Sequence, residues 1–224
     1  VIKRCRKAPG HYPAIVNVAV GPWIEKVHKE RSELLDALKE ACSSAKVHRF
    51  NESKACVQHF TYDASVLFES RWEAIKQEPP IKEAGKFAEV EKAVKEIHKK
   101  CGEPHPYVAC LVADGDNMGN RINNCKNPSD LNDFSKKLSG FAGEVKEIVD
   151  KDYLGSLVYA GGDDVLAFVP LDKALDCADM LQDRFKAILG EGATLSVGLG
   201  IGHVMEAMGE LLELGREAEK LAKG

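Results

Sequence analysis

The sequence has 224 residues, of which 44% are hydrophobic and 29% charged, proportions typical of a globular protein with one large or two small domains. This composition argues against an intrinsically disordered chain. No apolar run approaches the roughly 18 residues that a membrane-spanning helix needs, and the start lacks the apolar core of a secretion signal. We therefore expect a cytoplasmic protein.

Charge is distributed unevenly along the chain. Residues 1–106 carry 19 Lys and Arg against 15 Asp and Glu, a net charge of +4, whereas residues 107–224 carry 12 against 20, a net charge of −8. The basic half should lie nearer to nucleic-acid phosphates, and the acidic half suits divalent metal ions. The chain opens with Val1 and its first methionine is Met118, so we expect it to be a piece of a longer protein.

The seven cysteines are an odd number, and no two have the Cys-x-x-Cys spacing that is common in zinc sites and redox motifs. Several lie in apolar patterns, where a thiol packs as a small hydrophobic group. We expect neither disulfides nor a complete zinc site, although Cys5 could be one ligand of a zinc cluster whose other members lie outside this chain.

The first part of the chain, residues 1–106, is expected to form a mostly helical domain. Apolar residues recur at helical spacing over 22–42 and over 85–100. The stripe of the first segment comprises Ile24, Val27, Arg31, Leu34, Leu35, Leu38 and Ala41. Residues 54–76 are ambiguous, but their apolar residues suggest a further helix in the same core. Two prolines within 102–106 place the domain boundary there.

The second part, residues 107–224, shows a different pattern. Tyr107–Ala113 is a continuous apolar run, typical of a strand buried on both faces. The pattern then predicts helix, strand, strand, helix, strand and helix over about 128–148, 156–160, 165–169, 172–189, 194–201 and 207–224. The order β-α-β-β-α-β-α indicates an α+β, ferredoxin-like palm, in which helices cover one face of an antiparallel sheet.

Side chains at the helix ends follow from the same pattern. Ser129 and Asp172 are expected to be the N-caps of the first two palm helices. The buried helix faces are expected to include Leu131, Leu175, Met208 and Leu221.

Acidic residues end two strands that should lie side by side. The first and third strands are neighbours in this topology, so Asp114 should lie beside Asp163 and Asp164 of the hairpin that enters the third strand. Carboxylates held this close repel one another unless a cation is present. Oxygen ligands on a rigid sheet suit Mg²⁺ or Mn²⁺. The residues therefore predict a metal site for nucleotide chemistry of the two-metal type.

The hairpin turn contains two glycines. Gly161 and Gly162 can adopt positive φ, and without a Cβ they let a triphosphate approach the backbone closely. Gly-Gly-Asp-Asp could instead be an ordinary hydrophilic turn, since Gly and Asp are common in turns. The position of Asp114 at the end of the preceding buried strand favours the metal site.

Three segments of the second part resemble a known family. Val112–Gly119, Leu157–Ala167 and Glu219–Lys223 look like the large catalytic subunit of type III CRISPR effector complexes, of the Cmr kind, and more distantly like the palms of GGDEF and class III nucleotide cyclases. The first half is compatible with the domain between the two palms of that family. The resemblance implies an antiviral defence enzyme that joins ATP into cyclic oligoadenylate second messengers when its complex of guide RNA and sister subunits holds a target RNA.

Carried over by position, the resemblance also implies roles for single residues. Asp114, Asp163 and Asp164 would be catalytic and hold metal, with the carbonyl of Gly115 as an additional ligand. The residues that would bind the nucleotide are Gly161, Gly162, Lys223, Asn117 and Asn120. Lys223 could instead be an exposed lysine favoured by the helix dipole, and the two asparagines could be turn residues.

Other polar positions stay open. Asp116 could ligate metal or only brace its loop, Ser196 could face the nucleotide or only pack, and an isolated His203 is more typical of a structural residue. The family pairs two palms and only one is visible in this sequence, so we do not expect these residues alone to complete cyclisation. The sequence has no His-Asp dipeptide of an HD-type nuclease, and we assign it no DNase activity.

Two other functions compete with oligoadenylate synthesis. One is a GGDEF-like dinucleotide cyclase that uses GTP, which fits less well at Asp164 and at the loop of Met118 and Gly119. The other is a non-catalytic palm that serves as a scaffold in a ribonucleoprotein. The intact acids argue against the scaffold, because an unused cluster of carboxylates only destabilises a fold.

Overall fold

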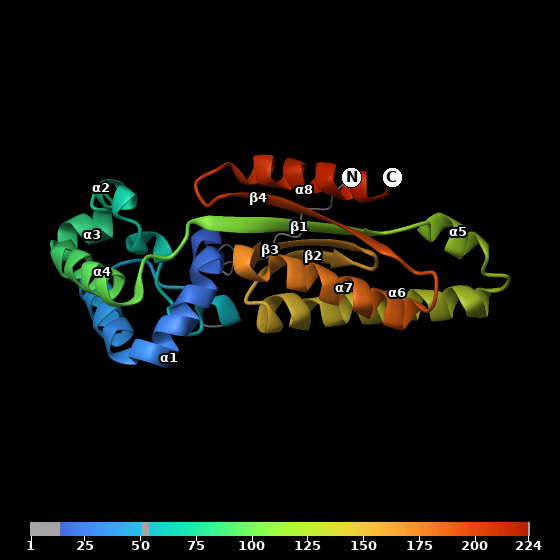
Figure 1. Cartoon of the computed structure of the whole chain (residues 1–224), viewed down its shortest axis with the longest axis horizontal. Coiled ribbons are helices and arrows are strands. Elements are labelled where there is room, and N and C mark those ends of the chain that lie inside the picture. Colours follow the sequence, from blue (N-terminus) through green and yellow to red (C-terminus); the bar gives the residue numbers. More distant parts are fainter. Residues whose placement is uncertain (1–13, 51–53, 224) are drawn as a thin grey trace.

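The computed structural model describes residues 14–50 and 54–223 of the chain (Figure 1). Cys5, the possible zinc ligand, lies outside the described residues. Helices form the first part and a four-stranded sheet with helices forms the second, so the expected α+β palm preceded by helices is confirmed. The division into domains at residues 106 and 107 stays a prediction. Among the helices of the described residues, none is long and apolar enough to cross a membrane.

The helical region, which we define as residues 14–101, is built around two long helices. They are α1, Ile15–Ser44, and α4, Phe87–Cys101, with the short helices α2, Trp72–Ile75, and α3, Pro79–Ala84, beside them. Helix α1 begins earlier than the pattern over 22–42 predicted and contains Pro22. It also kinks at Arg31, which has non-helical φ and ψ of −149° and 54°. The placement of Arg31 on the buried stripe was wrong, because the kink turns this side chain to solvent.

Residues 54–76 do not form the single helix that their apolar pattern suggested. They contain three short 3₁₀ turns, Ala55–Val57, Ala64–Leu67 and Glu69–Arg71, followed by α2. The carboxylate of Asp63 accepts a hydrogen bond from the Ser65 backbone N–H at 2.9 Å, which favours a turn over a continuing helix. The expected packing into the same core is confirmed for Phe60, Tyr62, Val66, Leu67 and Trp72.

The palm contains four antiparallel strands in the order β2-β3-β1-β4. The strands are β1, Tyr107–Gly115, β2, Ser156–Gly161, β3, Asp164–Pro170, and β4, Leu195–His203. The helices are α5, Met118–Asn123, α6, Pro128–Glu147, α7, Ala174–Leu189, and α8, Met208–Lys223. Strands β1 and β3 are neighbours, as the topology predicted.

Alternate residues of β1 pack against different helices. Ala109, Leu111 and Ala113 share a core with α6 and α7, where the rings of Phe141 and Phe185 pack edge to face with their centroids 5.0 Å apart. Val108, Cys110 and Val112 face the opposite way, toward α8 and the start of α1. Figure 1 shows α8 on one side of the sheet and α6 and α7 on the other. The prediction that helices cover one face is thus correct for the two connecting helices, α6 and α7, but was wrong for α8, which lies on the other face.

Both predicted helix caps were wrong. Asn127, not Ser129, caps α6, because its side chain accepts a hydrogen bond from the Asp130 N–H at 2.9 Å and Pro128 occupies the first helical position. Asp172 lies in a 3₁₀ turn before α7 and contacts Nε2 of His105 at 2.8 Å.

Four apolar side chains expected on buried faces are exposed instead. They are Leu131, Leu175, Met208 and Leu221, with exposed fractions from 44% to 83%. All four lie in the first or last turn of their helices. A helical stripe there extends past its packing partner, and single exposed apolar side chains are common on protein surfaces.

Candidate nucleotide site

The register of the sheet brings Asp114 next to the hairpin acids. Ala113 pairs with Val165 across β1 and β3, so the next residue of β1, Asp114, lies beside Asp164 at the start of β3. The hairpin is tight, since Gly161 pairs with Asp164 and only two residues lie between them. Gly162 has a φ of 83°, which glycine adopts without strain. The fold thus places all three aspartates at one end of the two central strands.

The pKa values of the two hairpin carboxyls, Asp163 and Asp164, are both raised. Burial raises the pKa of Asp163, and the charge of Asp114 raises it further. Burial also raises the pKa of Asp164, followed by the charges of Asp114 and Asp163. The ionised forms therefore disfavour one another at this end of the sheet, and a cation would relieve that cost.

A lysine supplies positive charge at this place. The ammonium group of Lys223 donates a short hydrogen bond to Asp114 and lies 2.8 Å from Oε1 of Glu219. Although burial lowers the pKa of Lys223, its hydrogen bonds to these two carboxylates raise it overall. The sequence analysis did not predict Glu219 as a site residue. It is only 7% exposed. Its position four residues before Lys223 was the signal that could have found it.

Helix α8 carries Lys223, and glycines let it lie close to β4. A Cβ at Gly198 would overlap the backbone of Gly215 and Glu219, and one at Gly200 would lie 2.6 Å from the nitrogen of Gly215. Real Cβ atoms do not approach backbone this closely, so these positions need glycine. The contact fixes the helix on the sheet and thereby holds Lys223 over Asp114.

Gly115 is also required by packing. A Cβ there would lie 2.9 Å from atoms of Asp163, Met118 and Phe185. The absence of a side chain therefore lets the hairpin come close to the end of β1. The role of the Gly115 carbonyl as a metal ligand stays a prediction.

The two turn glycines, Gly161 and Gly162, differ in how much free space surrounds them. The hydroxyl of Tyr159 lies where a Cβ of Gly161 would be, so in this structure a tyrosine uses the space that we expected a triphosphate to use. A Cβ at Gly162 would make only ordinary contact with Leu138 at 3.8 Å. Tyr159 is 51% exposed and can move aside without breaking a core contact.

Asp116 braces its loop. The hydroxyl of Ser196 donates to Oδ1 of Asp116 at 2.7 Å, and the Asp116 N–H donates to the carbonyl of Thr194 at 3.0 Å. Of the two possible roles, this geometry favours the brace, and it gives Ser196 a partner other than a nucleotide. Asn117 follows in the left-handed conformation, with φ of 55°.

An open cavity of about 390 Å³ lies beside these residues. Its lining is Gly115, Asp116, Asn117, Thr194 and Lys223. Asn120 is exposed on α5 and does not line it, and His203 packs edge-on against Tyr107 at the opposite end of β1. Of the predicted nucleotide contacts, Asn117 and Lys223 line this cavity.

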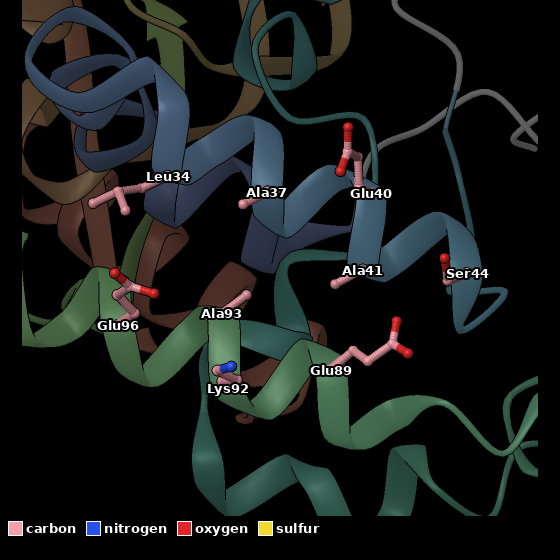
Figure 2. A pocket seen from close by; sticks show the side chains of 9 residues that line it. All are labelled: Leu34, Ala37, Glu40, Ala41, Ser44, Glu89, Lys92, Ala93 and Glu96. Carbon is pink, nitrogen blue, oxygen red and sulfur yellow. The ribbon is translucent and has the colours of Figure 1, made fainter.

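A second hollow of about 340 Å³ lies in the helical region between α1 and α4 (Figure 2). Its lining comprises Leu34, three alanines, Ser44, Lys92 and three glutamates, Glu40, Glu89 and Glu96. It contains none of the predicted site residues, and its three carboxylates outnumber the one lysine, which disfavours phosphate. We therefore assign the candidate nucleotide site to the palm.

The three aspartates do not form a finished metal cage. Within residues 14–50 and 54–223, no group of three or more His, Cys, Asp or Glu side chains is placed to hold a metal ion. Asp114 is turned to Lys223 instead, which is the expected result when only a lysine balances its charge. The donor set still fits Mg²⁺ or Mn²⁺, because Asp114 and Asp164 on neighbouring strands and Asp163 in the adjoining turn all offer hard oxygen atoms.

The sheet order, the helices and the hairpin between β2 and β3 define a palm-type domain. The family described as "Cas10/Cmr2, second palm domain" matches residues 107–224, and the chain belongs to this family. It therefore contains a palm of the large subunit of type III CRISPR effector complexes, which confirms the resemblance seen in the sequence.

The chain is also similar to one curated relative and to several solved structures. The chain is 30% identical over 191 residues to the CRISPR system Cmr subunit Cmr2 of Pyrococcus furiosus, an alignment covering 69% of this chain and 22% of that protein. It is similar to a Csm1-Csm4 cassette in complex with pppApA, with 24% identity, a TM-score of 0.48, and coverage of 52% of this chain and 19% of the other. Csm1 in T.onnurineus is 26% identical, with a TM-score of 0.46 and the same coverage. The chain thus spans about a fifth of the length of these proteins.

Proposed function

We propose that this palm takes part in converting ATP into cyclic oligoadenylates within an RNA-guided type III CRISPR complex that has bound target RNA. The observation that carries the proposal is the placement of Asp114 beside Asp163 and Asp164, with Lys223 on the same carboxylate. Membership in the Cas10/Cmr2 palm family supports it.

The chain's own residues would divide the work as follows. Asp114, Asp163 and Asp164, with the Gly115 carbonyl, would hold Mg²⁺ or Mn²⁺. When bound, such a cation neutralises the triphosphate charge and lowers the pKa of an attacking hydroxyl. Lys223 and Asn117 would contact the nucleotide from the cavity, and Gly161 and Gly162 would let phosphate approach the turn once Tyr159 moves aside.

In this reaction the protein would position the two nucleotides and stabilise charge, without forming a covalent intermediate. The hydroxyl oxygen of one nucleotide forms a bond to the α-phosphorus of the next, the bond to pyrophosphate breaks, and the hydroxyl proton passes to solvent. Among the described residues that line the cavity, Lys223 alone carries an ammonium group, which is suited to the negative charge that builds on the phosphates. A second palm would supply the partner nucleotide. If the chain divides into a helical domain, 1–106, and a palm domain, 107–224, the chemistry belongs to the palm domain.

Guide RNA, target RNA, sister subunits and ATP are the partners that this proposal requires, and we propose a cytoplasmic complex. The test uses the complete protein assembled in its complex with ATP, Mn²⁺ and target RNA. We expect oligoadenylates from the wild type and a loss of at least about a hundredfold when Asp163 and Asp164 are both changed to Ala. Undiminished product from the double variant would contradict the proposal.

The same assay separates the competing functions. Each of the four nucleoside triphosphates is supplied alone. Product from GTP only would indicate a dinucleotide cyclase, and no product from any nucleotide would favour a scaffold. Asp183→Ala, on the exposed side of α7, is the matched control for loss of an aspartate.

A further inference from the structure

A buried ion pair joins the helical region to the palm. Nζ of Lys54 lies 3.3 Å from Oδ1 of Asp150, and the two side chains are only 12% and 11% exposed. They are 96 residues apart in the sequence. Removing two charges from water costs free energy unless further hydrogen bonds compensate, so the contacts around the pair determine its effect on the structure.

Those contacts converge on the start of β2. Lys54 donates to the hydroxyl of Ser156 at 2.8 Å and to the carbonyl of Leu157 at 3.4 Å. Oδ1 of Asp150 accepts the Leu157 N–H at 2.7 Å. Both backbone groups of Leu157 are therefore held by the ion pair, one by each partner.

An irregular turn positions the side chain of Asp150 next to β2. It lies in a π-helical turn, Ile148–Asp152, that follows α6. The chain then reverses at Gly155, whose N–H donates to the carbonyl of Val149 at 2.8 Å and where a Cβ would lie 2.9 Å from that same oxygen. Such turns interrupt a helix at a cost and frequently occur at functional sites.

The held residue is also the point where the pairing of β2 with β3 shifts. Leu157 pairs with Ala167, but Tyr159 pairs with Leu166, so one residue of β2 is left out of the ladder. In the sheet that the described residues form, β2 is an edge strand and pairs with β3 alone. A slip of one residue would turn every following side chain to the other face, as far as Gly161 at the hairpin.

We propose that Lys54 is a positioning residue for the nucleotide site: from the helical region it fixes, through Asp150 and Leu157, the register of β2 and so the place of the Gly161–Asp164 hairpin. This gives the helical region a direct effect on the palm. The activity part of the inference rests on the proposed function, whereas the structural part does not.

The first measurement is hydrogen exchange of amides 157–162 in the complete protein without nucleotide. Lys54→Met keeps the length of the side chain and removes its charge. We expect at least about tenfold faster exchange over this segment, because hydrogen bonds to a charged group are lost. Lys100→Met is the matched control, since it breaks an exposed pair with Glu96 in the same region and should leave this segment unchanged.

A second variant separates positioning from bulk stability. Lys54→Met combined with Asp150→Asn removes both buried charges, so thermal stability should recover toward that of the wild type. Exchange over 157–162 should stay fast, because no ammonium holds the Leu157 carbonyl. Recovery of both quantities together would overturn the inference, and the double variant remains informative if Lys54→Met alone fails to fold.

The third measurement is kcat and KM for ATP in the assembled complex. We expect Lys54→Met to lower kcat about tenfold or more with KM changed less than about threefold, and Lys54→Arg to restore part of the loss. Slow exchange like that of the wild type, or fast exchange with unchanged kcat, would overturn the positioning role. If the wild type makes no oligoadenylate while the exchange results hold, the proposed function fails and the structural part of the inference stands.

Discussion

The ammonium group of Lys223 contacts the carboxylate of Asp114, which lies 109 residues earlier in the chain. The positive charge of Lys223 also offsets part of the effect by which burial and Asp114 raise the pKa of Asp163. A metal ion that takes the Asp114 oxygen bound by Lys223 would displace the ammonium group, which would keep its contact with Glu219 and become available to a triphosphate. The lysine and the metal compete for one carboxylate.

This competition predicts opposite effects of Lys223→Ala on two ligands. Without nucleotide, Mn²⁺ should bind the variant more tightly, by about threefold to tenfold, because its competitor is gone. ATP should bind about tenfold more weakly, because a charged contact to phosphate is lost. Calorimetric titration of each ligand measures both. Lys220→Ala, an exposed lysine of the same helix, is the control, and weaker Mn²⁺ binding by Lys223→Ala would contradict the competition.

Gly198→Ala should destabilise the palm through α8. Its Cβ would overlap the backbone of Gly215 and Glu219, so the helix must shift away from β4. We expect a loss of about 1–3 kcal/mol in the free energy of unfolding, measured with urea. Gly209→Ala, in the same helix with open space around it, should be neutral or slightly stabilising. Equal effects of the two substitutions would show that the close approach is not required.

Asp163→Asn should stabilise the metal-free protein at neutral pH. Burial and then the charge of Asp114 raise the pKa of Asp163 in the folded state. A raised folded pKa means that stability is fully present below the unfolded pKa, about 3.9, and is lost as pH rises through the folded value. The amide removes this loss.

The expected gain is a few tenths of a kcal/mol at pH 7, since solvent screens the group, and it should disappear near pH 4. Thermal unfolding without divalent metal at the two pH values measures it. Asp183→Asn on α7 should have the same small effect at both values. A lower Tm for Asp163→Asn at pH 7 would mean that the carboxylate is stabilised by its surroundings.

Asn117 offers a way to separate a turn residue from a nucleotide contact. Its φ of 55° is easily adopted by glycine, so Asn117→Gly should keep the free energy of unfolding within about 0.5 kcal/mol. If the side chain contacts the nucleotide from the cavity, KM for ATP should rise about tenfold. An unchanged KM would leave Asn117 as a turn residue only.

The sequence predicted the sheet well because strands and helices of the palm differ clearly in period. The buried run Tyr107–Ala113, followed later by two strands around a four-residue turn, was enough to infer that β1 and β3 are neighbours. Residues 54–76 were misjudged because a short apolar run does not distinguish a helix from a series of turns. The cap of α6 was misplaced because Asn127 and Ser129, on either side of Pro128, are both residue types that cap helices. The cap of α7 was wrong because Asp172 lies in a 3₁₀ turn before the helix.

Some contacts in and around the site could not be predicted, because no local sequence pattern indicates them. The pair of Lys54 and Asp150 joins residues 96 apart and depends on a π-helical turn, which leaves no periodic signal. The contact of the Tyr159 hydroxyl with Gly161 likewise depends on side-chain direction at the end of an edge strand. By contrast, the spacing of Glu219 and Lys223 was visible in the sequence.

The most direct test of the central claim is a structure of the complete protein with Mn²⁺ and a non-hydrolysable ATP analogue, with manganese located by its anomalous scattering. We predict manganese bound to Asp114 and the hairpin acids Asp163 and Asp164, the triphosphate at the Gly161–Gly162 turn, and Lys223 moved from Asp114 to a phosphate. Manganese and nucleotide bound elsewhere, with Lys223 still on Asp114, would contradict the account.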